Sequence, residues 1–186
     1  MKKFELTTEF ITNAFGKKLF RIKALVEFGD VKAGELGGYV EKEGNVSQDD
    51  NAWVSGDAEV FGNAKVSGNA KVFGNAKVYD NAWVSDNARV SGDARVYDNA
   101  WVSGDARVSG DADYALVQGF GTEFRCTTFY RGKNKKIMVN CGCFHGDLEG
   151  FRKQVKETRN GKIAKEYLMI ADLMEYHFTS EDSSNE

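Results

Sequence analysis

The sequence predicts a mainly β protein whose central part is a short parallel β-helix. Ten consecutive six-residue units run from Val54 to Asp113, and every unit has valine at its first position and alanine at its fifth. Each unit combines a short extended piece, Ala-x-Val-x, with a two-residue corner of Gly or Asp followed by Asn or Asp. A fixed short period of this kind is the signature of a solenoid. The chain also lacks proline, which would remove a hydrogen bond from stacked strands.

The repeat also predicts which side chains fill the interior of the coil. Alternation along each extended piece sends alanine and valine to one side and the two variable residues to the other. Gly, Asn and Asp suit the corners because they accept positive φ at low cost. The expected interior consists of the alanines from Ala58 to Ala112 and of Val54, Val60, Val66, Val72, Val78, Val84, Val90, Val96, Val102 and Val108.

Composition sets limits on the function. The chain has 186 residues, of which 41% are hydrophobic, and this is enough for one or two domains with a core. A net charge of −3 gives no general attraction to nucleic acid. No apolar stretch is long enough to span a membrane, and the N-terminal residues lack the apolar core of a signal peptide. We therefore expect a cytoplasmic protein whose three cysteines are thiols.

Residues 1–45 do not follow the repeat and predict an N-terminal β cap. Residues 4–11 and 19–28 alternate in polarity like two strands, and residues 13–17 form a turn between them. A glycine-rich piece, residues 34–40, then leads into the repeat, which we place at residues 46–114. An open solenoid end exposes unpaired backbone and apolar interior, so a cap is expected there.

The remaining residues predict a small ββαα module at 115–179 and a disordered tail at 180–186. Residues 124–131 and 137–144 alternate around a turn at 132–135, which indicates a hairpin. Asp147 is a suitable N-cap for a first helix, and a second helix is expected after Asn160-Gly161. The tail is polar and follows no periodic pattern.

The repeat resembles the hexapeptide left-handed β-helix, and this resemblance implies triangular coils of three units each. The flanks resemble a group of bacteriophage and prophage proteins. In that group such repeats are enclosed by an N-terminal segment like residues 28–40 and a C-terminal one like Thr127-Thr128-Phe129-Tyr130-Arg131 with Cys141-Gly142-Cys143-Phe144. The resemblance implies a phage-type origin and a homotrimer, and it assigns no reaction.

With 18 residues per coil, outward side chains stack about 4.8 Å apart on those 18 positions away. Three different faces result. The first is basic and carries Trp53, Lys71, Arg89 and Arg107 beside Ser55, Phe73, Ser91 and Ser109. The second carries Glu59, Lys77, Arg95 and Asp113 beside Phe61, Tyr79 and Tyr97. The third carries Lys65, Trp83 and Trp101 beside Ser67, Ser85 and Ser103.

The faces yield two site hypotheses. The rings Phe61, Tyr79 and Tyr97 lie either under a terminal cap or at an oligomer interface, because large exposed aromatic patches usually mark contacts. A ligand site is expected where Trp rings and cations meet in a cleft between subunits, since these groups recognise a base and an anion. Its candidate residues are Lys65, Lys71, Trp83, Arg89, Trp101 and Arg107.

An enzyme is the less favoured hypothesis. Hexapeptide β-helices include acyl-CoA-dependent acyltransferases with a histidine base, but the repeat here contains no histidine and no acceptor loop. Asp80, Asp86 and Asp98 stand at corners, where turn geometry explains them. A zinc site is a minor possibility at Cys126, Cys141, Cys143 and His145. We interpret the cysteines as buried structural thiols and therefore expect neither a metal nor another cofactor.

The sequence therefore predicts a non-catalytic binding protein with no membrane and no nucleic-acid partner. It would either sequester a small anionic, nucleotide-like host molecule or mask a host protein, in the manner of a counter-defence factor. The acyl-CoA-dependent acyltransferase is kept as the alternative.

Overall fold

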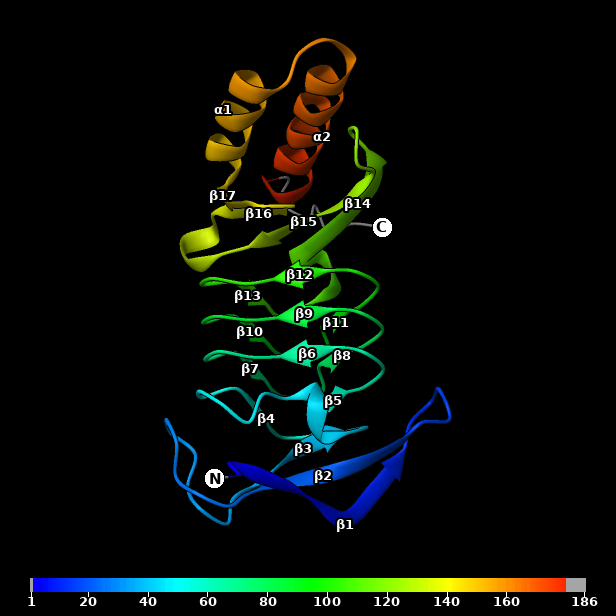
Figure 1. The fold of residues 1–186 in the computed structure, drawn as a ribbon, viewed down its shortest axis with the longest axis vertical. Helices are drawn as coiled ribbons and strands as arrows, with labels where there is room; N and C mark the ends of the chain where they lie inside the picture. Colours follow the sequence, from blue (N-terminus) through cyan, green and yellow to red (C-terminus); the bar gives the residue numbers. More distant parts are fainter. Residues whose placement is uncertain (1, 180–186) are drawn as a thin grey trace, which may run out of the picture. The chain divides into compact units, whose positions relative to one another are not determined.

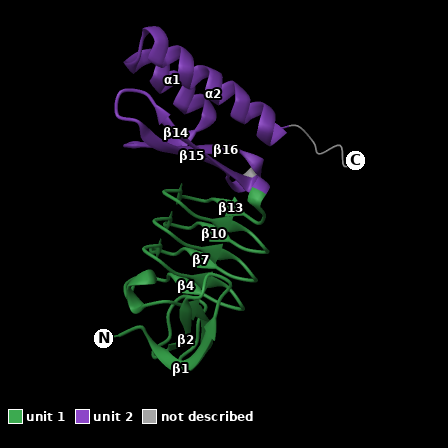
Figure 2. Cartoon of the chain, turned by 90° about the vertical axis from the view of Figure 1, so that its right-hand side faces the viewer, with its two compact units in different colours: residues 1–111 green, residues 112–186 purple. Residues whose placement is uncertain are grey.

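The computed structural model describes residues 2–179, which form two compact units divided between Asp111 and Ala112 (Figure 2). The division falls within three residues of the repeat end that the sequence predicts. The predicted tail at residues 180–186 lies outside the described residues.

The first unit is a parallel β-solenoid with an antiparallel N-terminal cap, which confirms the predicted fold class (Figure 1). Three short strands make one coil, and the strands of successive coils stack in parallel. The solenoid strands are β4 (Trp53–Val54), β5 (Glu59–Val60), β6 (Lys65–Val66), β7 (Lys71–Val72), β8 (Lys77–Val78), β9 (Trp83–Val84), β10 (Arg89–Val90), β11 (Arg95–Val96), β12 (Trp101–Val102) and β13 (Arg107–Val108).

The predicted 18-residue register is confirmed by the strand pairing. Trp53 pairs with Lys71, Glu59 with Lys77, and Lys65 with Trp83. The first face is the sheet β13-β10-β7-β4, and the third face is the sheet β12-β9-β6. The second face continues into the cap as the sheet β1-β2-β3-β5-β8-β11.

The interior of the solenoid is built as the repeat predicts up to Val108, whereas Ala112, also predicted to point inward, is exposed because the chain leaves the coil there in the 3-10 helix η2 (Asp111–Asp113). All ten valines from Val54 to Val108 are at most 1% exposed, and so are the repeat alanines from Ala58 to Ala106. Burying a valine side chain contributes about 1.5–3 kcal/mol relative to exposure. The coil is therefore a stack of small apolar side chains held by a continuous backbone ladder, in which Phe73 N–H, for example, donates to the Val90 carbonyl over 3.0 Å.

The corners explain why the repeat alternates Gly and Asp at its third position. This position has positive φ in every unit from Gly56 to Gly104, for example 68° at Gly62 and 58° at Asp80, but not at Gly110 in the last unit. The next residue stacks its side chain on the coil above: Asn63 donates to Asn81 over 3.2 Å, and Asn81 donates to Asn99 over 3.3 Å. Backbone geometry therefore accounts for the corner Asp residues without a catalytic role.

The cap comprises β1 (Phe4–Thr12), β2 (Lys18–Ala24), β3 (Leu36–Val40) and the 3-10 helix η1 (Glu43–Asn45). Two details differ from the sequence prediction. The second strand ends at Ala24, because the chain then turns at Gly29, where φ is 54°. The glycine-rich piece contains β3, which pairs antiparallel with β2 and parallel with β5. The cap sheet thus joins the solenoid directly.

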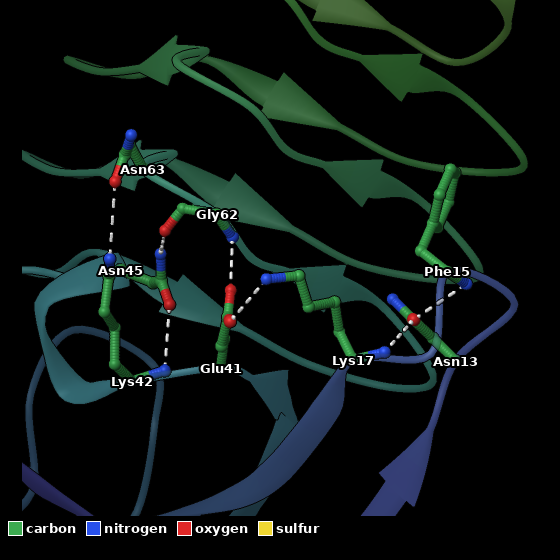
Figure 3. Close-up of polar contacts among 8 residues, drawn as sticks. All are labelled: Asn13, Phe15, Lys17, Glu41, Lys42, Asn45, Gly62 and Asn63. Atoms are coloured by element: carbon green, nitrogen blue, oxygen red, sulfur yellow. Dashed lines mark hydrogen bonds and ion pairs between the residues drawn. The ribbon is translucent and has the colours of Figure 1, made fainter.

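Polar contacts connect the cap to the first coil (Figure 3). The Glu41 carboxylate accepts a hydrogen bond from the Gly62 N–H over 2.6 Å and forms an ion pair with Lys17 over 3.2 Å. Asn45 donates to the carbonyl oxygen of Gly62 over 3.3 Å. The Asn13 side chain accepts from the N–H groups of Phe15 and Lys17, both over 3.0 Å, and so shapes the β1–β2 turn.

Replacing Glu41 by Gln should lower the free energy of unfolding by about 1 kcal/mol at neutral pH, because a charge-assisted hydrogen bond becomes a neutral one. The Gly62 N–H and then Lys17 lower the pKa of Glu41 below its ordinary 4.5. A carboxylate with a depressed folded pKa stabilises the fold above the unfolded pKa, and this contribution is lost as pH falls through the folded pKa. The difference between wild type and variant should therefore shrink below pH 4.5.

Urea unfolding at several pH values measures this difference. Glu27→Gln is the control, because Glu27 is exposed and should give little difference at any pH. A Glu41→Gln penalty that persists unchanged into acid would exclude the ionised carboxylate as its cause.

The second unit is a four-stranded antiparallel sheet with two helices. The 3-10 helix η2 (Asp111–Asp113) begins at the last residue of the first unit. The second unit then contains the 3-10 helix η3 (Lys133–Lys135), the strands β14 (Tyr114–Phe120), β15 (Arg125–Arg131), β16 (Ile137–Cys141) and β17 (Phe144–Asp147), and the helices α1 (Leu148–Thr158) and α2 (Gly161–Thr179). The sheet order is β14-β15-β16-β17. The predicted hairpin corresponds to β15 and β16, and the sequence prediction missed β14 and β17.

The missed strands have simple causes. Residues 114–117 look like the end of the repeat, yet they begin a strand that pairs Ala115 with Phe129. Gly142, at φ 60°, turns the chain after Cys141, so the expected single strand to Phe144 becomes two. The N-cap prediction is confirmed, since the Asp147 side chain accepts from the Gly150 N–H over 2.9 Å. The core of this unit includes Phe129, Phe151 and Tyr167, with Phe129 and Tyr167 each edge-on to Phe151.

Candidate functional site

The third face of the solenoid carries two tryptophans whose rings are held in place by serines. Trp83 and Trp101 stack with centroids 5.4 Å apart and ring planes 12° apart. The Trp83 indole N–H donates to Ser67 Oγ over 3.0 Å, and the Trp101 indole N–H donates to Ser85 Oγ over 3.2 Å. Ser67, beside Lys65, and Ser85, beside Trp83, therefore each hold the ring one coil above them.

Trp101 stacks on only one of the two faces of the Trp83 ring. Strand β9 lies between β12 and β6, so Trp101 covers one face of Trp83 and the other face is directed toward the coil of Lys65. Trp83 is 43% exposed. Lys65 is also exposed and is the direct strand partner of Trp83 in the parallel pair β6–β9. Lys65 and Trp83 are thus neighbours in one column of outward-facing side chains within one subunit.

The other predicted cations differ in whether they already have a partner within the fold. Lys71 forms an ion pair with Asp30 of the cap, and this contact lowers the pKa of Asp30. The Arg107 guanidinium donates to the carbonyl oxygens of Asn87 over 3.2 Å and of Ala106 over 2.7 Å. Between residues 2 and 179, Lys65 and Arg89 form no ion pair. Lys71 and Arg107 therefore already have partners within the fold, whereas Lys65 and Arg89 form no ion pair among the described residues.

Trp53, the first member of the basic column, is buried under the cap. Its exposed fraction is 3%, and its ring contacts Phe4 and Phe28 edge-on at centroid distances of 6.3 Å and 5.4 Å. The first face thus begins at Lys71 as a solvent-facing surface, and Arg89 is its most accessible cation.

The second-face rings form a continuous stack that the cap partly covers. Phe61 and Tyr79 lie 5.0 Å apart, and Tyr79 and Tyr97 lie 5.3 Å apart. Phe15, at the tip of the β1–β2 turn, packs on both Phe61 and Tyr79 at 5.4 Å. Phe61 is 4% exposed and Tyr97 is 39% exposed. Burial raises the pKa of Tyr79. The covering of these rings by a terminal cap, one of the two predicted interpretations, thus holds for Phe61 and Tyr79.

The charged column beside these rings pairs internally. Lys77 and Glu59 form an ion pair over 2.6 Å, and Asn13 donates to the other carboxylate oxygen of Glu59 over 3.2 Å. Asp113 does not extend this column as predicted, since it lies in η2 and forms an ion pair with Arg131 over 3.0 Å. The column of the second face therefore ends at Arg95.

A groove beside the β1–β2 turn was missed by the sequence analysis. It measures about 560 Å³ and is lined by Phe15, Tyr79, Asp80, Asn81, Asp98 and Asn99, among others. Its far wall is the corner ladder, whose 18-residue spacing is visible in the sequence. Its near wall is the turn that carries Phe15, and nothing in the repeat predicts where that turn lies.

The cysteines do not form the arrangement that the sequence analysis considered. Cys141 ends β16, Cys143 lies in the following turn and His145 lies in β17, so the three residues are not on one strand. Thr127 donates to Cys141 Sγ over 3.1 Å, and His145 hydrogen-bonds through Nδ1 to Asn140. Across the described part of the chain, no group of three or more His, Cys, Asp or Glu side chains is placed to hold a metal ion.

Comparison with known proteins adds a fold assignment for part of the repeat. The family model of the YdcK beta solenoid repeat matches residues 88–104. These residues run through β10, β11 and β12, almost one full coil. No curated protein matches the chain. Among the described residues, neither helix has the length and apolar character needed to cross a membrane.

Proposed function

We propose that the chain is a non-catalytic binding protein whose solenoid holds a small anionic ring compound, nucleotide-like in chemistry, at Trp83 and Lys65. The observation that carries this proposal is the direct pairing of Lys65 with Trp83, whose opposite ring face is already stacked on Trp101. Indole stacking and an ammonium group are together suited to a base joined to a phosphate.

The proposal narrows the six residues that the sequence suggested. Lys71 and Arg107 have partners within the fold, and Trp101 supports the ring of Trp83. Arg89 lies on the first face, so it reaches a ligand on the third face only across a subunit boundary. We propose a homotrimer in which Arg89 of one subunit approaches Trp83 of the next. Tyr97, at the exposed end of the second-face stack, is the candidate contact for this assembly.

The biological setting follows from the resemblance of the flanks to phage and prophage proteins. A phage-type protein that binds a nucleotide-like host molecule in the cytoplasm would act by sequestration, as a counter-defence factor. Masking of a host protein by the same face is the competing form of this proposal. The acyl-CoA-dependent acyltransferase receives no support from an observed site, since His145 and His177 both lie in the second unit.

Calorimetric titration with mono-, di- and cyclic nucleotides and with acyl-CoAs tests the proposal. We expect binding by at least one nucleotide, and we expect Trp83→Ala to weaken it by about ten- to a hundredfold, because stacking is worth about 1–3 kcal/mol per base. Lys65→Gln should weaken binding of the phosphorylated compound while leaving its unphosphorylated nucleoside unaffected.

Lys71→Gln is the matched control, since Lys71 lies on the same coil as Trp83 and its ammonium group is paired with Asp30. It should bind as wild type does. Absence of heat with every compound, or equal affinities in wild type and Trp83→Ala, would remove the ligand site and favour a protein partner.

A further inference from the structure

The second unit contains a pocket that the proposed function does not use. It measures about 80 Å³ and lies beside α1, near the turns that join β14 to β15 and β16 to β17. Phe144, Phe151 and Val155 give it an apolar wall. Arg125, Arg159 and Tyr167 also line it. An apolar recess with a few convergent polar groups is the usual form of a small-molecule site.

The two arginines have no carboxylate partner within residues 2–179. Both guanidinium groups nevertheless affect the same side chain, the hydroxyl of Tyr167. Burial and the neighbouring Cys141 raise the pKa of the Tyr167 hydroxyl, whereas Arg159 and Arg125 lower it. Arg125 of β15 and Arg159, which follows α1, thus line the same pocket as Tyr167, and their positive charges lower the pKa of its hydroxyl.

Two glycines make this arrangement possible. A Cβ atom at Gly121 would collide with the Tyr167 hydroxyl, and a Cβ atom at Gly142 would collide with the Arg125 guanidinium. Both glycines have positive φ, 74° and 60°, which other residues rarely adopt. The turns on either side of the pocket are thus shaped so that the hydroxyl and the guanidinium lie against their backbones.

We propose that this pocket binds a small organic monoanion, namely a carboxylate attached to an apolar ring. The ring packs on Phe144, Phe151 and Val155, and the carboxylate lies between Arg125 and Arg159. Glu123 also lines the pocket. Two guanidinium groups and one carboxylate leave a single net positive charge, which favours a monoanion over a phosphate dianion.

The size of the pocket agrees with this ligand class. An apolar cavity of roughly 150 Å³ holds a benzene molecule. A recess of about 80 Å³ therefore receives part of a ring and leaves the carboxylate at the mouth, where both arginines are exposed. Benzoate is thus the appropriate probe, with benzyl alcohol as its neutral analogue and phenyl phosphate as the dianionic one.

The cysteines provide a readout within the full-length chain. Cys141 and Cys143 line the pocket, whereas Cys126 does not. We expect benzoate to slow iodoacetamide alkylation of the exposed Cys143 several-fold, measured by peptide mass spectrometry, and to leave Cys126 alkylation unchanged. Benzyl alcohol should give no protection, and phenyl phosphate should protect less than benzoate.

Arg125→Gln and Arg159→Gln should each abolish the protection, while Lys153→Gln, an exposed change on α1, should retain it. Circular dichroism confirms that each variant is folded. Alkylation of Cys143 that is equally fast with and without benzoate would overturn the proposal. Equal protection by benzyl alcohol, or protection retained in both arginine variants, would also overturn it, since either result would remove the anion from the interaction.

Discussion

Val84→Asp is expected to lower the unfolding free energy of the solenoid by about 3–5 kcal/mol, because it buries a carboxylate with no positive partner. Val84 is completely buried and belongs to a central coil. Its neighbours above and below in the column are Val102 and Val66, so the interior offers no group to neutralise the charge. The midpoint of thermal unfolding, followed by circular dichroism, should fall by roughly 10 °C.

Arg95→Asp is the matched control for this change. Arg95 points outward from the same coil and is exposed, so its carboxylate remains in water. We expect its midpoint to lie within a few degrees of wild type. Equal midpoints for Val84→Asp and Arg95→Asp would show that the assignment of inward and outward positions is wrong.

Gly37→Ala is expected to lower the free energy of unfolding by about 1–3 kcal/mol, because the added methyl group overpacks the contact between the cap and the solenoid. A Cβ atom at Gly37 would lie 2.6 Å from the Val54 carbonyl oxygen and 2.8 Å from Cζ2 of Trp53. The added methyl group can be accommodated only if β3 moves away from the first coil. Chemical denaturation monitored by tryptophan fluorescence measures the loss, since Trp53 is buried at this joint.

Gly44→Ala makes the same chemical change where no atom lies within 4 Å of the added methyl group. It should be neutral or slightly stabilising, because alanine loses less backbone entropy than glycine on folding. A Gly37→Ala protein as stable as Gly44→Ala would mean that β3 does not approach the first coil as closely as described.

The solenoid could be predicted from the sequence because the same local preferences recur in every six-residue unit. Valine and alanine at fixed places give the interior, and Gly or Asp at the corner gives the positive φ observed at Gly62 and Asp80. A regular coil then stacks residues 18 apart by geometry alone. Lys65 and Trp83 could be assigned to one column from the sequence for this reason, and the pairing of β6 with β9 confirms it.

The cap contacts could not be predicted in the same way, because they join residues without a shared period. The pairing of Lys71 with Asp30 and the packing of Phe15 on Phe61 depend on how two irregular turns fold. Neither turn carries a sequence signal for its position. The solvent-accessible part of the first and second faces was consequently overestimated, and the proposed ligand site is smaller than the six candidate residues, consisting of Lys65 and Trp83.

The second unit, too, could be predicted only in part from the sequence. Alternation correctly identified β15 and β16, yet Gly142 was read as part of a strand although its positive φ makes it a turn. That single turn separates Cys141 from His145 and removes the supposed common face of the cysteine cluster. The pocket beside Tyr167 depends on the same turn, so the sequence analysis had no means of finding it.

Native mass spectrometry of the protein purified from cells tests the central claim, binding without catalysis at Trp83 and Lys65, most directly. The account predicts a noncovalent ligand of nucleotide-like mass that is released chemically unchanged on denaturation and is missing from Lys65→Gln. The same spectrum reports the number of subunits. A bound species with the mass of coenzyme A, or a protein that carries no ligand and takes up none of the added nucleotides, would contradict the claim.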